Sequence, residues 1–232
     1  RKFKKFGKIE VMSKFRAIIF DMVGVLIDTE PYYYTRRQTF LDTKGISIAH
    51  LSPLDFIGGN MKQVWYMILR GDYDKWDVPA LQAEYTQYKL NHAIPYDTLL
   101  FSDAKSTLVA LKAEGYKLGL ASSTIKLEIL RAMKMTGLLP YFEVVLSGDD
   151  FEESKPNPEI YQVAMAKLGV APEESLVIED SEKGIDAGVD SGATVWGIRD
   201  HRFGLDQSRA DELFENLTEI AGRLAIGDQL AP

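Results

Sequence analysis

The stretch AIIFDMVGVLIDTEP, residues 17–31, decides how this chain folds. It opens with four apolar residues, 17–20, and a short apolar run of this kind is typical of a strand buried on both faces of a parallel sheet. Asp21 ends the run, so the strand presents a carboxylate at its carboxyl end. The stretch closes on Asp28-Thr29-Glu30-Pro31, whose capping residues, early acid and early proline predict the start of a helix.

Two different patterns follow that opening strand. Residues 31–95 contain no convincing strand and predict helices, whereas from about residue 96 apolar strands alternate with helices across short loops. Such alternation predicts an α/β fold with a parallel sheet between helices, a Rossmann-like three-layer core. The expected helices are 31–44, 61–70, 78–92, 103–114, 125–136, 158–168, 182–191 and 211–224, and the later strands are 117–121, 144–146, 175–178 and 194–197.

These patterns divide the chain into three parts. Residues 15–29 and 96–232 form the predicted core, and residues 30–95 form an inserted helical-bundle cap. Residues 1–14 are interpreted as a basic tail, because residues 1–16 carry a charge of +6 within a chain whose net charge is −7. The remaining acidic body argues against a broad nucleic-acid surface, since such surfaces are basic.

Composition excludes several classes of function. The chain has no cysteine, which rules out disulfides, thiolate catalysis and cysteine zinc sites. No apolar run approaches the roughly 20 residues that a membrane-spanning helix needs, and no secretory signal is visible. We therefore expect a cytoplasmic protein, a monomer that binds neither membrane nor nucleic acid.

Polar residues follow four of the predicted strands. Asp21, Ser122 and Glu179-Asp180 come directly after apolar runs, and a loop after residue 146 leads to Lys155. The carboxyl ends of parallel strands meet at one edge of a sheet, where ligands bind in such folds. Each feature alone also fits a structural role, such as the helix N-cap that Ser122 could form.

Together these residue types indicate phosphate chemistry. Carboxylates that face each other need a cation between them, and oxygen ligands without histidine or cysteine favour Mg²⁺ over zinc. A carboxylate can also act as a nucleophile and form an aspartyl-phosphate. Lys155 would neutralise charge on the phosphoryl group, while Ser122 and neighbouring backbone N–H groups would hold its oxygens.

Four motifs in this order resemble the haloacid dehalogenase superfamily, and most closely its branch of beta-phosphoglucomutase-like phosphatases with a helical cap. The resemblance covers about residues 15 to 225. The segments that carry it are Phe20-Asp21-Met22-Val23-Gly24-Val25-Leu26-Ile27-Asp28-Thr29-Glu30-Pro31, Leu120-Ala121-Ser122-Ser123-Thr124, Ser154-Lys155-Pro156-Asn157-Pro158, and Val177-Ile178-Glu179-Asp180-Ser181 with Gly184 and Gly188.

The resemblance implies a role for each matching position. Asp21 would be the nucleophile and a magnesium ligand, Asp180 a second ligand, and Glu179 a ligand directly or through water. The backbone carbonyl of residue 23 would also face the metal. The phosphoryl group would be held by Ser122, Ser123 and Lys155, and the substrate would meet Gly59, Asn60, Lys62 and Thr124.

Position 23 departs from the family pattern. Phosphatases and mutases of this branch carry Asp there as general acid and base, whereas this chain carries Val23, which can transfer no proton. Such proton transfer contributes roughly 100- to 10,000-fold in rate. The resemblance therefore implies a magnesium-dependent phosphatase for a small phosphorylated metabolite, such as a sugar phosphate, with impaired turnover.

Three alternatives remain open. The chain could bind a phosphorylated metabolite without turning it over. It could cleave phosphonates, because that branch has a small apolar residue at the same position and uses a cap lysine, here Lys62, to form a Schiff base. It could also be a mutase, although Tyr33 stands where beta-phosphoglucomutases place a histidine.

Overall fold

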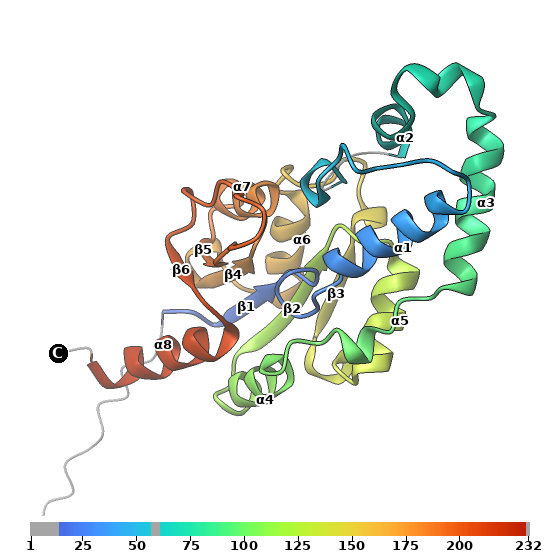
Figure 1. Cartoon of the computed structure of the whole chain (residues 1–232). Coiled ribbons are helices and arrows are strands. Elements are labelled where there is room, and N and C mark those ends of the chain that lie inside the picture. Colours follow the sequence, from blue (N-terminus) through green and yellow to red (C-terminus); the bar gives the residue numbers. More distant parts are fainter. Residues whose placement is uncertain (1–13, 57–60, 231–232) are drawn as a thin grey trace, which may run out of the picture.

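A six-stranded parallel sheet forms the centre of the protein, as the computed structural model, which describes residues 14–56 and 61–230, shows (Figure 1). The strand order is β3-β2-β1-β4-β5-β6, so β1 lies in the middle with β2 and β4 beside it. All neighbouring pairs run parallel. The strands are β1 Ala17–Phe20, β2 Lys117–Ser122, β3 Val144–Ser147, β4 Ser175–Glu179, β5 Thr194–Ile198 and β6 Glu212–Phe214.

The two faces of the sheet are covered by different helices. Successive side chains of a strand point to opposite faces. Ile18 and Phe20 join a buried cluster with α4, α5 and α8, whereas Ala17 and Ile19 join a second cluster with α6 and α7. The predicted three-layer α/β fold is therefore confirmed. These helices are α4 Ala104–Ala113, α5 Lys126–Thr136, α6 Glu159–Leu168, α7 Glu182–Asp190 and α8 Leu217–Leu230.

A third hydrophobic cluster lies in the segment between β1 and α4. It is built by α1 Glu30–Asp42, α2 Met61–Leu69 and α3 Val78–Asn91, with Phe40, Trp65 and Tyr85 among its buried side chains. Figure 1 shows these three helices on the side towards which β1 points, away from the helices that cover the sheet. The assignment of residues 30–95 to an independent cap domain stays a prediction.

Short 3₁₀ turns complete the described structure, at Pro53–Phe56, Arg70–Lys75, Tyr96–Thr98, Leu139–Tyr141, Gly148–Asp150 and Pro172–Glu174. Most of the predicted helices and strands begin and end within three residues of the observed bounds. Among the residues that the structure describes, no helix combines the length and the apolar character that crossing a membrane requires. The basic tail lies outside the described residues up to position 13.

The predicted helix at 211–224 was wrong at its start. The chain instead forms a sixth strand, β6, whose residues pair with β5 in the register Trp196↔Glu212 to Ile198↔Phe214. The ring of Phe214 lies 4.9 Å from that of Trp196, centroid to centroid. A three-residue run carries almost no periodic signal of its own, so pairing with β5 decides its conformation. The helix α8 begins only at Leu217.

Candidate active site

Asp21 lies at the carboxyl end of the central strand. Its backbone N–H donates a hydrogen bond to the carbonyl of Ile178 at 2.9 Å, which continues the pairing of β1 with β4 beyond the strand itself. The residue is only 7% exposed, so its carboxylate is held by protein groups rather than by bulk water. Rigid pairing on a central strand gives this side chain a well-defined position.

Lys155 connects three of the strand ends. Its ammonium donates to Asp21 Oδ1 at 2.6 Å, to Glu179 Oε1 at 2.7 Å and to the carbonyl of Ala121 at 2.9 Å. Asp21 follows β1, Glu179 is the last residue of β4 and Ala121 lies in β2. The loop between β3 and α6 therefore places the lysine at the edge where these three strands end. An ammonium group has three protons, and here all three are engaged.

The Glu179 carboxylate, fully buried, accepts hydrogen bonds at both oxygens. Oε1 accepts from Lys155 and from the hydroxyl of Tyr161 at 2.7 Å. Oε2 accepts from the backbone N–H groups of Asp180 and Ser181 and from the Ser181 hydroxyl at 3.1 Å. This carboxylate is therefore fixed in orientation, and it helps to hold the Lys155 ammonium beside Asp21.

Asp180 completes a cluster of three carboxylates. Asp21, Glu179 and Asp180 each offer one oxygen within 4.8 Å of the others, an arrangement that could hold a metal ion. Gly24, with a backbone φ of +80°, allows the close approach, because a Cβ at this position would overlap the Asp180 carboxylate. Glycine is the residue that adopts such a φ without steric cost, so the glycine of the first motif has a local physical role.

Burial and charge perturb this cluster strongly. Burial raises the pKa of Asp21 to about 6, although Lys155 opposes the rise. Burial, with Glu179 and Asp21 close by, raises the pKa of Asp180 well above its usual range. Burial also acts to raise the pKa of Glu179, but the charge of Lys155 and the hydrogen bonds from Lys155, Tyr161 and Ser181 together outweigh it, so this pKa is lowered. Three carboxylates beside one ammonium leave an excess of negative charge that a divalent cation would neutralise.

Ser122 ends β2 beside this cluster, and it is 2% exposed. Its hydroxyl oxygen accepts a hydrogen bond from the backbone N–H of Thr124 at 3.3 Å. The carbonyl of Thr124 accepts in turn from the hydroxyl of Ser147, at the end of β3. Ser123 between them is exposed. The loop that precedes α5 is thus anchored to the sheet, and its roles in phosphate and substrate binding stay predictions.

Val23 sits two residues after Asp21 and is half-buried. Its backbone N–H donates to the Asp21 carboxylate, which lowers the pKa of that group and partly offsets its burial. The backbone also forms an isolated parallel bridge with Ile27. The position is therefore well held by its main chain, while its isopropyl group has no proton to give or take.

The groups predicted to contact substrate from the cap, namely Gly59, Asn60 and the Lys62 side chain, lie outside the described part of the structure. Gly59 and Asn60 lie outside the described residues. Lys62 lies in α2, and its side chain is outside the described part of the structure as well. The proposed contacts of these three residues with a substrate therefore stay predictions.

Two functional-looking residues escaped prediction from sequence. Tyr161 lies in α6, 18 residues before Glu179, and its buried hydroxyl orients that carboxylate. Gln207 lies in the loop before β6, and its amide donates to the carbonyls of Asp180 and Ile198. An apolar-face tyrosine in an amphipathic helix is normally interpreted as a residue of the hydrophobic core. A glutamine in a loop belongs to no sequence pattern that predicts a function. Only their contacts with the strand ends distinguish them.

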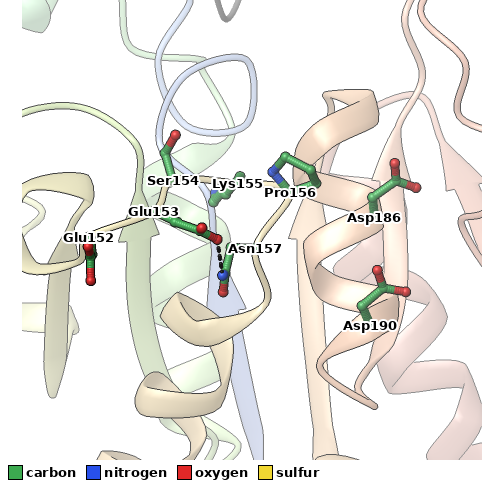
Figure 2. A pocket seen from close by; sticks show the side chains of 8 residues that line it. All are labelled: Glu152, Glu153, Ser154, Lys155, Pro156, Asn157, Asp186 and Asp190. Atoms are coloured by element: carbon green, nitrogen blue, oxygen red, sulfur yellow. Dashed lines mark hydrogen bonds between the residues drawn. The ribbon is translucent and has the colours of Figure 1, made fainter.

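A surface pocket of about 670 Å³ lies on the outer side of the Lys155 loop (Figure 2). Its lining contains four acids, of which Asp186 and Asp190 are both paired with Arg209. Figure 2 shows Glu153 bonded to the amide of Asn157, whereas the Lys155 ammonium is engaged at the strand ends. The acids of this pocket do not belong to the group of carboxylates that could hold a metal ion. The carboxylate cluster, where a cation could offset the negative charge, is therefore the better candidate site for a phosphate. The lining residues are Glu152, Glu153, Ser154, Lys155, Pro156, Asn157, Asp186 and Asp190.

A family model described as haloacid dehalogenase-like hydrolase matches residues 18–198, which include all four strand-end motifs. The chain belongs to this family. The predicted family is therefore confirmed, and so is the prediction of an enzyme of the phosphoric monoester hydrolase type, at the level of the family.

Relatives within this family agree with the phosphatase branch. Pyrophosphatase PpaX of Bacillus pumilus is 27% identical over 90% of this chain and 95% of its own length. The phosphorylated carbohydrates phosphatase of Thermotoga maritima is 29% identical over 78% of this chain and 84% of its own. The crystal structure of beta-phosphoglucomutase from Clostridium difficile shares the fold, with a TM-score of 0.72 at 21% identity over 93% of this chain and 97% of that one.

Proposed function

We propose that this haloacid dehalogenase-like hydrolase is a magnesium-dependent phosphatase that removes phosphate from a small phosphorylated metabolite, such as a sugar phosphate. The observation that carries the proposal is the pairing of buried Asp21 with Lys155 at 2.6 Å, inside a cluster of three carboxylates at the carboxyl edge of the sheet. The names of the relatives, a pyrophosphatase and a phosphatase of phosphorylated carbohydrates, support the same class of substrate.

The donor set fits Mg²⁺. Carboxylate oxygens of Asp21 and Asp180 and the backbone carbonyl of Val23 are the hard ligands that this ion prefers. Glu179 already accepts hydrogen bonds at both oxygens, which favours its contact with the ion through water. When bound, Mg²⁺ would neutralise charge on the phosphoryl oxygens and on the carboxylates.

The first chemical step uses Asp21 as nucleophile. A carboxylate oxygen attacks phosphorus, the bond from phosphorus to the ester oxygen breaks, and an aspartyl-phosphate and an alkoxide form. Lys155 holds the carboxylate before attack, and its proton nearest Asp21 can turn to a phosphoryl oxygen once the carboxylate charge is consumed. Ser122 and the N–H groups of the following loop would bind the remaining oxygens.

Proton transfer is the weak part of this mechanism. The alkoxide needs a proton, and the water that later attacks phosphorus must lose one. With Val23 in place, both protons have to move to and from solvent water, which is less effective than a positioned carboxyl group. We infer that phosphate transfer to Asp21 is slow with alkyl esters and faster with activated aryl esters, whose leaving groups need no proton.

Restoring the acid provides the test. Phosphate release from a panel of sugar phosphates is measured with Mg²⁺ for the present chain, Val23→Asp and Val23→Asn. The aspartate should raise kcat/KM by about 100-fold or more, whereas the asparagine, of the same size but without an ionisable proton, should not. Asp21→Asn in the Val23→Asp background should abolish turnover.

A lack of gain with Val23→Asp, in a protein that still folds and binds Mg²⁺, would overturn the proposal. The absence of the acid at position 23 also favours a second candidate function, the binding of a phosphorylated metabolite without turnover. That function predicts stabilisation by ligand with no phosphate release, even from p-nitrophenyl phosphate. Cleavage of phosphonates through Lys62, a mutase activity, a cytoplasmic location and a monomeric state stay predictions.

A further inference from the structure

The turn that ends β3 lies directly against the loop that follows β2, the segment expected to hold the phosphoryl group. The two strands pair so that Ser147, the last residue of β3, stands opposite Ser122, the last residue of β2. β3 is an edge strand with β2 as its neighbour, whereas β1, which leads to Asp21, lies on the other side of β2. The turn after β3 therefore contacts this loop from the side away from the nucleophile.

Ser147 makes the central contact between the turn and the loop. Its side chain is fully buried, and its hydroxyl donates to the carbonyl of Thr124 at 2.7 Å. The same oxygen accepts from the backbone N–H of Asp149 at 3.2 Å. Thr124 in turn donates its N–H to the hydroxyl oxygen of Ser122. A hydroxyl that accepts in this way still has its own proton to donate, so the chain of contacts orients Ser122 as a donor.

A second contact holds the start of α5. The carboxylate of Asp149 accepts from the backbone N–H of Lys126, the first residue of that helix, at 3.0 Å. The first N–H groups of a helix have no partner within the helix, and the side chain at the N-cap position, Ile125, offers none. Asp149 supplies the missing acceptor from the turn after β3. The loop is thus fixed on both sides of Ile125.

Gly148 allows the turn to approach the loop this closely. A Cβ at this position would lie 2.8 Å from the carbonyl oxygen of Ser123 and 3.2 Å from its Cα, whereas a favourable contact between carbon atoms is about 3.5–4.0 Å. The overlap is with main-chain atoms, which cannot rotate away as the end of a side chain can. The φ of Gly148 is not in the left-handed region, so an alanine there would be opposed by Ser123 and not by its own backbone conformation.

We propose that Ser147, Gly148 and Asp149 are positioning residues of the active site, which hold the loop after β2 where its hydroxyl and N–H groups can bind the phosphoryl oxygens. They act through the main chain of residues 123–126 and need no contact with the substrate themselves. Donors that are fixed before the substrate arrives stabilise its charge without reorganisation. The inference rests on the proposed function, because it assigns the donors of this loop to the phosphate of the substrate.

The test measures binding of inorganic phosphate to the full chain by titration calorimetry at saturating Mg²⁺. Ser147→Ala should weaken phosphate binding about 10-fold, the lower end of the loss expected when a hydrogen bond to a charged group is removed. The affinity for Mg²⁺ itself should not change, because the carboxylates of the cluster lie at the ends of β1 and β4. Gly148→Ala removes no hydrogen bond but displaces Ser123, and it should weaken phosphate binding in the same way.

Ser175→Ala is the matched control for the loss of a buried hydroxyl. Ser175 is also fully buried, and its hydroxyl donates to the carbonyl of Ala171 at 2.9 Å, but it begins β4, at the opposite edge of the sheet. Urea denaturation should show similar losses of stability for Ser147→Ala and Ser175→Ala, whereas only Ser147→Ala should weaken phosphate binding.

Two further pairs separate position from stability. Gly71→Ala is the control for Gly148→Ala, because a Cβ at Gly71 would meet nothing within 4 Å, and it should leave phosphate binding unchanged. Asp149→Asn keeps an oxygen that can accept from the N–H of Lys126, so it should retain more phosphate affinity than Asp149→Ala.

Equal phosphate affinities of the Ser147→Ala and Ser175→Ala chains would overturn the inference, as would a parallel fall in Mg²⁺ affinity or an absence of phosphate binding by the unaltered chain. If Ser147→Ala fails to fold, the comparison of Gly148→Ala with its control decides in the same way. Failure of the proposed function has a different outcome. Phosphate would then still bind in a manner that depends on Ser147, while the Val23→Asp chain would release none from sugar phosphates.

Discussion

Replacement of Lys155 by methionine should destabilise the protein more than any other single change at the strand ends. The Lys155 side chain is 5% exposed, and its partners Asp21 and Glu179 are 10% and 0% exposed. Removing one member of a buried ion pair typically costs about 3–5 kcal/mol, because it leaves an uncompensated charge. Lys155→Met leaves two buried carboxylates, so we expect a loss in the upper part of that range, against a total stability of about 5–15 kcal/mol for such domains.

The size of the loss should depend on pH. Without the ammonium, the pKa of Asp21, which is already raised, should rise further. The pKa of Glu179, which Lys155 helps to hold down, should rise above its unfolded value of about 4. A carboxyl group with a raised folded pKa destabilises the protein above that pKa, and the cost disappears as the pH falls towards the unfolded pKa. The destabilisation by Lys155→Met should therefore be larger near pH 8 than near pH 5, where the carboxylates can take up protons.

Urea denaturation in metal-free buffer at both pH values measures this effect. Lys126→Met is the matched control, because Lys126 forms an ion pair with Asp150 in which both side chains are 38% exposed. Such an exposed pair contributes about 0–1 kcal/mol, so its loss should be small at either pH. An equal loss for the two variants, or a loss from Lys155→Met that does not vary with pH, would refute the electrostatic account of the site.

Two further predictions concern the metal. Gly24→Ala should weaken Mg²⁺ binding, measured by titration calorimetry, at least 10-fold more than the control Gly204→Ala. Both glycines have a positive φ, but only a Cβ at Gly24 would overlap the Asp180 carboxylate. Equal effects of the two substitutions would contradict this steric argument. Thermal stabilisation by Mg²⁺ should be largest above pH 7 and should fall as the pH drops through the Asp21 pKa of about 6. The reason is that protons compete with the ion for the carboxylates. Stabilisation that persists at pH 5 would indicate that the ion binds at another site.

Much of the site could be predicted from the sequence, because Asp21, Ser122 and Glu179 lie at the ends of recognisable strands and Lys155 lies in the loop that follows another. Parallel strands align their carboxyl ends at one edge, so a polar residue after each apolar run is brought close to the others without knowledge of the loops. Asp21, Lys155 and Glu179 do meet there, at 2.6 and 2.7 Å. The short strand β6 was missed for the opposite reason, since its three residues acquire their conformation from pairing with β5.

By itself, the sequence determined the order of strands and helices as far as β5, the family, and the lack of an acid at position 23. It also predicted that Asp21, Ser122, Lys155 and Glu179 converge at one edge of the sheet. These features depend on local periodicity and on residue identity. The tertiary structure alone decided how charge is distributed among those groups. That Lys155 donates to three acceptors and that Tyr161 orients Glu179 depend on burial and on contacts between distant segments. Such contacts follow from packing in three dimensions, which no local pattern encodes.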